Sequence, residues 1–223
     1  MTPPLPQADP LSLRVTEVFY SIQGESTFAG QPCVFIRLTG CPLRCTWCDT
    51  EYSFYGGTMQ TIDQLLEQVA QYGCRLVELT GGEPLAQPDA HTLIHRLCDS
   101  GHTVLIETSG AIDTAPVDAR ARLILDVKCP GSGMADRMHW PNLDRLTGQD
   151  EVKFVLADRA DYDWARDIIQ RYRLAERCPI LFSPVFGTLE LRALAEWMLA
   201  DRVPARFQVQ LHKYIWAPDM RGV

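Results

Sequence analysis

The stretch Cys41-Pro-Leu-Arg-Cys45-Thr-Trp-Cys48 places three of the chain's eight cysteines within eight residues, at the spacing C-x3-C-x2-C. A structural zinc site takes four protein ligands, and the next cysteine, Cys74, follows only after a predicted helix, so the spacing disfavours a closed zinc site. Iron-sulfur clusters are also held by cysteine thiolates, and a four-iron cluster held by three cysteines leaves one iron open to another molecule. The spacing therefore favours a cluster with an open iron.

The other five cysteines are spread along the chain, at Cys33, Cys74, Cys98, Cys129 and Cys178. Buried free thiols are common, and disulfides rarely persist in reducing compartments. We therefore expect these five to be structural thiols.

The 223 residues are enough for one large domain, and a composition of 46% hydrophobic and 22% charged residues excludes a disordered protein. The formal charge of −7 argues against nucleic acid and anionic lipid as partners. No apolar stretch approaches the roughly 20 residues that a membrane span needs. The N-terminus carries four prolines within ten residues and no signal segment. We expect a flexible lead-in over 1–13 and a cytoplasmic protein.

Hydrophobic periodicity alternates strands with helices over 14–223, which predicts a single α/β domain. The predicted strands are Arg14–Phe19, Val34–Leu38, Leu76–Leu79, Val104–Ile106, Leu123–Leu125, Val152–Leu156, Ile180–Phe182 and Phe207–Leu211. The predicted helices are Thr61–Tyr72, with a capping-box spacing of Thr61 and Gln64, Asp89–Ser100, Asp161–Arg173 and Leu189–Leu199. Residues 130–148 are predicted to form a long excursion with at most one short helix. A closed eightfold barrel takes about 250 residues, so we expect a partial, open barrel of about six parallel strands with an N-terminal strand extension.

Polar side chains follow the ends of several predicted strands. They are Thr80, Glu107, Asp126 with Lys128, Ser183 and His212. Parallel α/β sheets carry their chemistry at the carboxyl ends of the strands, so we expect these side chains to face one cleft. The alternative is that these positions are polar only because loops are hydrated.

Trp47 places an aromatic residue directly before the third cysteine of the triad. A C-x3-C-x2-C triad with this aromatic residue resembles the signature of the radical S-adenosylmethionine (SAM) enzymes. Thr80-Gly-Gly-Glu-Pro84 resembles the GGE motif of the same superfamily, in which glycines let the backbone approach a ligand closely. The resemblance implies the superfamily's open-barrel fold, a 4Fe-4S cluster bound by Cys41, Cys45 and Cys48, and SAM chelated at the open iron.

Four further segments resemble one family, the 7-carboxy-7-deazaguanine synthases of the queuosine pathway. The segments are Phe19–Ser26, Phe35–Cys41, Cys48-Asp-Thr50 and His212-Lys-Tyr214, and the resemblance runs from about Thr16 to Pro218. The glycyl-radical activases share the triad but lack the Gln-Gly-Glu block and the terminal His-Lys. Two alternatives stay open: another radical SAM enzyme such as a glycyl-radical activase, and a non-catalytic iron-sulfur or zinc-binding module.

The resemblance implies conversion of 6-carboxy-5,6,7,8-tetrahydropterin to 7-carboxy-7-deazaguanine with loss of ammonia. The 5′-deoxyadenosyl radical removes a hydrogen from substrate C6, the ring contracts, and SAM is regenerated. A flavodoxin- or ferredoxin-type reductant and a homodimer are implied as well.

The implied substrate contacts are Ile22, Gln23, Gly24, Arg37, Thr80, Glu107, His212 and Pro218. Arg37 has a structural alternative, since an arginine among apolar residues needs an ion-pair partner such as Glu25. In family members that end at the proline matching Pro218, the terminal carboxylate lies near the substrate. Five residues follow it here, so either Asp219 or the Val223 carboxylate replaces that group, or the tail covers the mouth of the cleft.

The implied SAM contacts are Trp47, Cys48, Asp49, Gly82, Glu83, Asp126, Val127, Lys128, Phe182, Ser183, Pro184 and Val185. Asp126-Val-Lys128 departs from the family's more frequent Ser-x-Lys. Mg2+ is implied at Thr50, where water and substrate oxygens would complete its coordination. In a chain of net negative charge, an anionic substrate leads us to expect a locally positive cleft around Arg37, Lys128 and Mg2+.

Overall fold

The computed structural model describes residues 11–223, and the larger part of the predicted lead-in, 1–10, lies outside the described residues. Within this range nine strands form one sheet in the order β3-β1-β2-β4-β5-β6-β7-β8-β9. The strands are β1 (Ser12–Ile22), β2 (Pro32–Leu38), β3 (Thr58–Thr61), β4 (Leu76–Gly81), β5 (Thr103–Thr108), β6 (Arg122–Asp126), β7 (Glu151–Leu156), β8 (Ile180–Pro184) and β9 (Arg206–Phe207).

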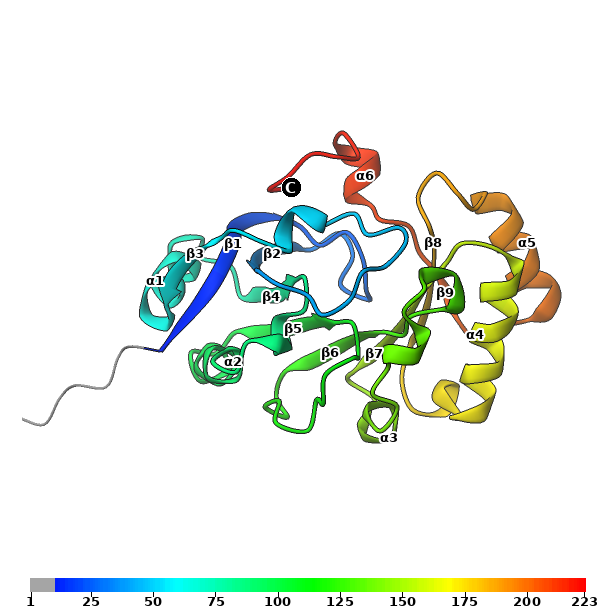
Figure 1. Ribbon diagram of the computed structural model, residues 1–223, viewed down its shortest axis with the longest axis horizontal. Coiled ribbons are helices and arrows are strands. Elements are labelled where there is room, and N and C mark those ends of the chain that lie inside the picture. Colours follow the sequence, from blue (N-terminus) through cyan, green and yellow to red (C-terminus); the bar gives the residue numbers. More distant parts are fainter. Residues whose placement is uncertain (1–10) are drawn as a thin grey trace, which may run out of the picture.

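The sheet is parallel from β2 to β9, whereas β1 and β3 pair antiparallel at its other end. Six of the parallel strands have five residues or more, and β9 has two. The strands β3 and β9 are the two edges, so the barrel does not close (Figure 1). The predicted partial, open barrel with an N-terminal strand extension is confirmed.

The observed strands differ most from the predicted strands at the two ends of the sheet. β1 begins at Ser12, two residues before the predicted start, and continues to Ile22. β3 was not predicted, because Thr58–Thr61 is polar and forms a strand only by pairing with the beginning of β1. β9 ends at Phe207, well short of Leu211, because the chain then turns so that Leu211 N donates to Gly24 O (2.9 Å).

Five helices lie between successive strands, and a sixth follows the last strand. They are α1 (Ile62–Gln71), α2 (Ala90–Asp99), α3 (Asn142–Arg145), α4 (Arg159–Arg171), α5 (Leu191–Asp201) and α6 (His212–Ile215). The predicted capping box of α1 is present, because Thr61 Oγ1 accepts from Gln64 N and Gln64 Oε1 accepts from Thr61 N. α3 is the one α-helix of the excursion over 130–148, where two short 3-10 turns also occur, at Pro130–Ser132 and Ala135–Arg137.

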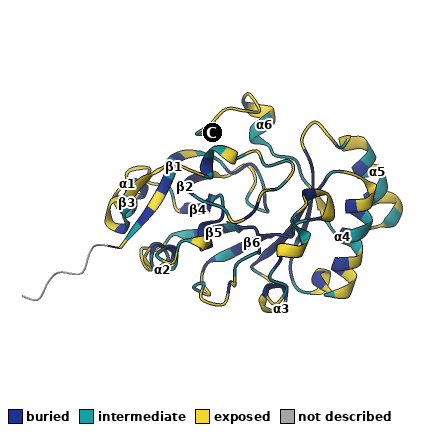
Figure 2. Ribbon diagram, in the orientation of Figure 1, coloured by how far each residue is buried: buried dark blue, intermediate teal, exposed yellow. Residues whose placement is uncertain are grey.

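The larger apolar core lies between the sheet and the helices, with Leu65 of α1, Leu93 of α2, Ile168 of α4 and Leu194 of α5 among its members. The middle strands are accordingly buried along most of their length (Figure 2). A smaller cluster of Phe19, Cys33, Phe35, Leu76, Leu105 and Ile124 packs separately from this core. Among the described residues, no helix has the length and apolar character needed to cross a membrane.

Gly81 and Gly82 allow the end of β4 to lie against the loop that follows β2. Gly81 has a positive φ of 143°, and a Cβ atom there would lie 2.2 Å from Leu38 O. A Cβ atom at Gly82 would lie 2.2 Å from Gly40 O and 2.8 Å from Cys41 Cβ. The close approach that these glycines permit is therefore first of all an approach of backbone to backbone, beneath the cysteine triad.

A Gly82→Ala substitution tests this packing. We expect a loss of about 1–3 kcal/mol in the free energy of unfolding, because the added methyl group overpacks a contact between two backbone segments. The measurement is chemical denaturation of the apo-protein. Gly148→Ala is the matched control, since a Cβ there would meet Arg177 O at an ordinary 3.8 Å. Equal stability of the two variants would contradict the packing argument.

Candidate active site

A cavity of about 450 Å3 opens at the carboxyl ends of the parallel strands. Its walls combine β1, the cysteine loop after β2, the ends of β4 to β8, and α6. Most of the predicted site residues line it: Ile22, Gln23, Gly24, Arg37, Cys41, Cys45, Trp47, Cys48, Asp49, Thr50, Thr80, Gly82, Glu107, Asp126, Lys128, Val185 and His212. The polar residues at the strand ends, with the exception of Ser183, therefore face one cleft as predicted.

The cysteine triad lies in one wall of this cavity. Cys41, Cys45 and Cys48 are free and half-buried. Burial raises the pKa of Cys41 and of Cys45, so the binding of metal by these thiols has to release protons. Within residues 11–223, no three His, Cys, Asp or Glu side chains converge on a position for a single metal ion. Three separate thiols around one cavity fit an iron-sulfur cluster, whose irons take one cysteine each.

Gln23, in another part of the cavity wall, is held by two contacts. Its Nε2 donates to Glu78 Oε2, and its Oε1 accepts from Glu25 N (2.9 Å). Glu78 is 2% exposed, and this burial together with the nearby Glu107 raises the pKa of Glu78 well above its ordinary value. The amide of Gln23 is thereby fixed in orientation before any ligand binds.

Gly24 and His212 approach each other closely. A Cβ atom at Gly24 would lie 2.3 Å from His212 Nδ1, so the histidine can occupy its position only beside a glycine. The hydrogen bond from Leu211 N to Gly24 O fixes the same contact. Burial lowers the pKa of His212, which favours a neutral imidazole facing the cavity.

Arg37 is both paired and accessible to the cavity. Its Nε donates to Glu17 Oε1 at 2.8 Å, and the same oxygen accepts from Tyr52 OH (2.8 Å). The predicted ion pair thus exists, but its acid is Glu17 and Glu25 has a different partner. Because Arg37 lines the cavity as well, the ion pair fixes the guanidinium and does not remove it from the site.

Glu107 is one of several acids that pair with the buried ammonium group of Lys153. It forms an ion pair with Lys153, and Thr80 Oγ1 donates to its other oxygen at 3.3 Å. Burial alone would raise the pKa of Glu107, but the adjacent Lys153 holds it below its ordinary value. Glu107 is therefore an ionised acceptor in the cavity wall.

Asp126 offers an acceptor atom that no other residue uses. Its Oδ2 pairs with Lys128 Nζ (2.7 Å), whereas Oδ1 is buried without a hydrogen-bond partner within residues 11–223. A buried acceptor without a partner fits a ligand hydroxyl, such as those of a ribose. Asp49, on the cysteine loop, pairs with Lys213 at 2.7 Å, which overcomes the effect of burial and lowers the pKa of Asp49 to about 2.

Six predicted contacts do not line the cavity: Glu83, Val127, Phe182, Ser183, Pro184 and Pro218. Glu83 is fully buried, and its carboxylate accepts from Leu85 N, Ser109 N and the hydroxyls of Thr108 and Ser109. The Phe182 ring packs into the core against the rings of Phe154 and Tyr162. Pro218 is exposed, and the cavity wall includes the terminal Val223 in its place.

The tail after Pro218 folds back over the cleft. The Arg221 guanidinium lies over the Tyr52 ring, 3.9 Å from its centroid. Tyr52 donates to the Glu17 oxygen that also holds Arg37. Among the residues of this tail, Val223 lines the cavity and Asp219 does not.

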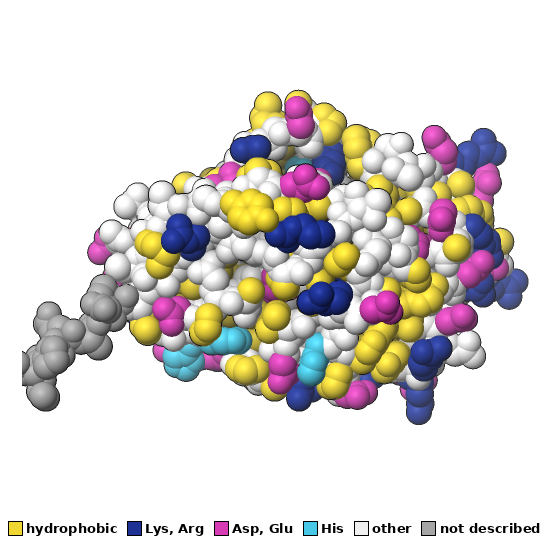
Figure 3. Space-filling model, viewed as in Figure 1, with side chains coloured by type: hydrophobic (Ala, Val, Ile, Leu, Met, Phe, Trp, Pro, Cys, Tyr) yellow, Lys and Arg dark blue, Asp and Glu magenta, His cyan; other side chains and the backbone are white. Residues whose placement is uncertain are grey.

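The protein's own side chains do not by themselves give the cleft an excess of positive charge, and the expectation of a locally positive cleft also included Mg2+. Five acids line the cavity beside four bases; the acids are Glu25, Asp49, Glu78, Glu107 and Asp126, and the bases are Arg37, Lys128, Lys153 and Lys213. Most of these groups are paired with one another, so charge in the site is balanced locally. The outer face in Figure 3 likewise intersperses basic and acidic side chains.

Sequence reasoning missed several cavity residues: Glu25 as a site residue, Glu78, Lys153, Gln210 and Lys213. For two of these residues, the surrounding sequence indicates a buried charge. Glu78 and Lys153 are charged residues inside otherwise apolar strand segments, Leu-Val-Glu-Leu and Val-Lys-Phe-Val. Charged residues are almost never fully buried without a partner, so their positions indicated a buried ion-pair network.

The chain is similar to known proteins over most of its length. The model of the radical SAM superfamily matches residues 35–181. The 7-carboxy-7-deazaguanine synthase of Chlorobaculum tepidum is 48% identical over 95% of this chain and 97% of its own length, and that of Koribacter versatilis is 43% identical over 95% and 100%. The crystal structure of QueE from Escherichia coli is similar with a TM-score of 0.76 and 24% identity, over 91% of this chain and 95% of that one.

The structural match supports the fold, and the sequence matches extend over nearly the whole length of both partners. The superfamily match spans the cysteine triad, the Gly-Gly-Glu motif and the strands that carry the cavity. The chain therefore belongs to the radical SAM superfamily and, within it, to the family of 7-carboxy-7-deazaguanine synthases.

Proposed function

We propose that this chain converts 6-carboxy-5,6,7,8-tetrahydropterin to 7-carboxy-7-deazaguanine with loss of ammonia. One observation carries the proposal: a single cavity of about 450 Å3 joins the cysteine triad to the Gln23, Arg37 and Glu107 side chains. A flat pterin with a carboxylate needs a cation for its acid and hydrogen-bonding groups for its ring edge. The cavity supplies both, and the cysteines that would hold the cluster line the same cavity.

The residues of the chain would bind and orient the reactants. When bound, the cluster and SAM supply the 5′-deoxyadenosyl radical that removes hydrogen from the substrate. Cys41, Cys45 and Cys48 would hold the cluster, and Asp126 Oδ1 would accept from a SAM hydroxyl. The residues of the cavity wall would also help to keep water from the bound reactants.

Substrate recognition would divide between two sides of the cavity. Arg37, fixed by Glu17, offers its remaining guanidinium N–H groups to the substrate carboxylate. Glu107, ionised beside Lys153, accepts from ring N–H groups. The neutral His212 imidazole and the oriented Gln23 amide contribute further polar contacts at the substrate edge.

The same proposal includes the cellular setting. SAM would be regenerated in each cycle, and the cluster would receive its electron from a flavodoxin- or ferredoxin-type protein. A cluster with an open iron is sensitive to oxygen, which supports a reducing compartment such as the cytoplasm. A homodimer is proposed from family membership, and size-exclusion chromatography with light scattering tests it.

The primary test is product formation by the anaerobically reconstituted protein. Supplied with the carboxytetrahydropterin, SAM, Mg2+ and a chemical reductant, the protein is expected to release 7-carboxy-7-deazaguanine and ammonia, detected by mass spectrometry. Less than one 5′-deoxyadenosine should form per product, because SAM is regenerated. Turnover of SAM without any deazaguanine would contradict the proposed substrate and favour another radical SAM reaction.

Cysteine substitutions test the assignment of the cluster ligands. Cys45→Ala is expected to abolish product and to lower iron and sulfide far below about four of each per chain, since one of three ligands is lost. Cys98→Ala is the matched control, because Cys98 lies on α2 outside the cavity and should retain the full cluster. Stoichiometric zinc without sulfide in the wild-type protein would instead favour a zinc-binding module.

We also propose that Thr50 binds Mg2+ together with the substrate. Thr50 lines the cavity, and its Oγ1 lies 3.7 Å from Cys48 Sγ, at the cluster end of the site. Its carbonyl oxygen already accepts from the amide and hydroxyl of Ser53, so the side-chain oxygen is the ligand. Mg2+ commonly keeps waters and completes its shell with ligand oxygens, which a carboxylated pterin provides.

A Thr50→Ala substitution tests the magnesium site. The Mg2+ concentration for half-maximal activity should rise about tenfold or more, because the one protein ligand is lost. Thr50→Ser, which keeps the hydroxyl, should retain most of the wild-type response. Thr46→Ala is the control, since Thr46 lies outside the cavity wall and its hydroxyl donates to Ser132 O. An unchanged Mg2+ titration of Thr50→Ala would show that the ion binds elsewhere.

A further inference from the structure

The side chain of Lys153 is a buried cation shared by several acids of the cavity. It projects from β7, and the residue is 4% exposed. Its Nζ lies 2.9 Å from Glu25 Oε2, forms an ion pair with Glu107, and lies 3.7 Å from Asp126 Oδ2. Neither the resemblance nor the sequence pattern assigned this lysine a role.

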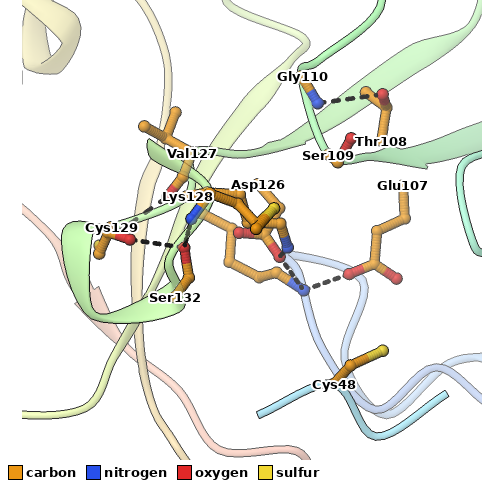
Figure 4. A network of polar contacts seen from close by, with 12 residues as sticks. Cys48, Glu107, Thr108, Ser109, Gly110, Asp126, Val127, Lys128, Cys129 and Ser132 are labelled. Atoms are coloured by element: carbon orange, nitrogen blue, oxygen red, sulfur yellow. Dashed lines mark hydrogen bonds and ion pairs between the residues drawn. The ribbon is translucent and has the colours of Figure 1, made fainter. Parts of the chain in front are cut away.

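The three acids belong to different parts of the site. Glu25 follows β1 and belongs to the Gln-Gly-Glu block, Glu107 lies on β5, and Asp126 ends β6. In Figure 4 the side chains of Glu107 and Asp126 point toward one another across the network. Glu107 is a proposed substrate contact and Asp126 a proposed SAM contact, so one ammonium lies between the two binding regions.

Hydrogen bonds and ion pairs extend the network beyond Lys153 and its three acids. Glu25 also accepts from Gln210 Nε2 (3.2 Å), and its backbone N holds the Gln23 amide. Asp126 continues the network to Lys128 at 2.7 Å. The chain of contacts therefore runs from the Gln23 side of the cavity to the Lys128 side, with Lys153 in its middle.

The electrostatics explain why the geometry depends on this one charge. Carboxylates brought together at a buried site repel one another strongly, because the surroundings screen charge much less than water does. Without the ammonium, Glu107 and Asp126 would rotate apart or take up a proton. Loss of one member of a buried ion network leaves the remaining charges uncompensated, which costs more than the loss of a surface pair.

We propose that Lys153 is a positioning residue for both ligands: it orients Glu107 toward the substrate and Asp126 toward SAM. This inference rests on the proposed function. Lys153 acts through its carboxylate partners, so its removal weakens two binding sites at once. A lysine that only stabilised the fold would leave both affinities intact in any variant that folds.

The test measures ligand affinity in the Lys153→Met variant under anaerobic conditions, with the cluster-loaded protein. Calorimetric titrations with SAM and with 6-carboxy-5,6,7,8-tetrahydropterin are made separately, so turnover is not the readout. Both dissociation constants are expected to rise about tenfold or more, as is typical when a residue that orients a ligand contact is lost. Wild-type affinity for either ligand would overturn the inference.

Lys128→Met provides the comparison within the site. Lys128 pairs with Asp126 at 2.7 Å and, among the described residues, has no ion pair with Glu107 or Glu25. This variant should lose affinity for SAM and keep that for the pterin, whereas Lys153→Met loses both. Identical patterns in the two variants would overturn the distinct role of Lys153.

Tyr162→Phe controls for general destabilisation. It removes a buried hydrogen bond to Asp201 (2.9 Å) outside the cavity wall, so it should lower stability with both affinities unchanged. If Lys153→Met does not fold, the double variant Lys153→Met/Glu25→Gln removes one buried charge of each sign, and the same double loss of affinity is expected. Wild-type protein that binds SAM but not the pterin would instead overturn the proposed function.

Discussion

Glu83 joins the ends of three strands through its buried carboxylate and its backbone N–H. It accepts from Leu85 N on its own segment and from Thr108 and Ser109 at the end of β5, while Glu83 N donates to Gly40 O beside the cysteine loop (2.8 Å). Burial raises the pKa of this acid, and its several donors oppose that effect. The relative positions of β2, β4 and β5 at the cavity depend on these bonds.

The same junction explains why two glycines precede Glu83. With no side chains at Gly81 and Gly82, the end of β4 lies directly against Leu38 and Gly40, and the loop with the cysteine triad rests on it. The position of Cys41, at the beginning of the cysteine loop, is therefore constrained by this contact. The Gly-Gly-Glu motif thus also packs against the loop that carries the cysteine triad.

The charged side chains in and around the cavity are arranged as ion pairs. Four acids each pair with a base: Glu17 with Arg37, Glu107 with Lys153, Asp126 with Lys128, and Asp49 with Lys213. Each pair fixes the direction of groups that face the ligands while keeping the net charge of the wall small. Preorganised polar groups of this kind need little rearrangement when substrate binds.

The sequence alone determined the fold class and the capped helix α1, because these depend on local spacing and hydrophobic periodicity. Its resemblance to known proteins indicated the family and the three cysteines that we propose as cluster ligands. The tertiary structure decided the contacts between distant residues. These are the ion pair of Arg37 with Glu17, the hydrogen bonds of Glu83 to the end of β5, the pairing of β3 with β1, and the ion pairs of Lys153 with three acids. Periodicity shows that a strand is buried, but it does not show which charged groups of other strands meet there. Those contacts arise only when the carboxyl ends of the strands come together around the cavity.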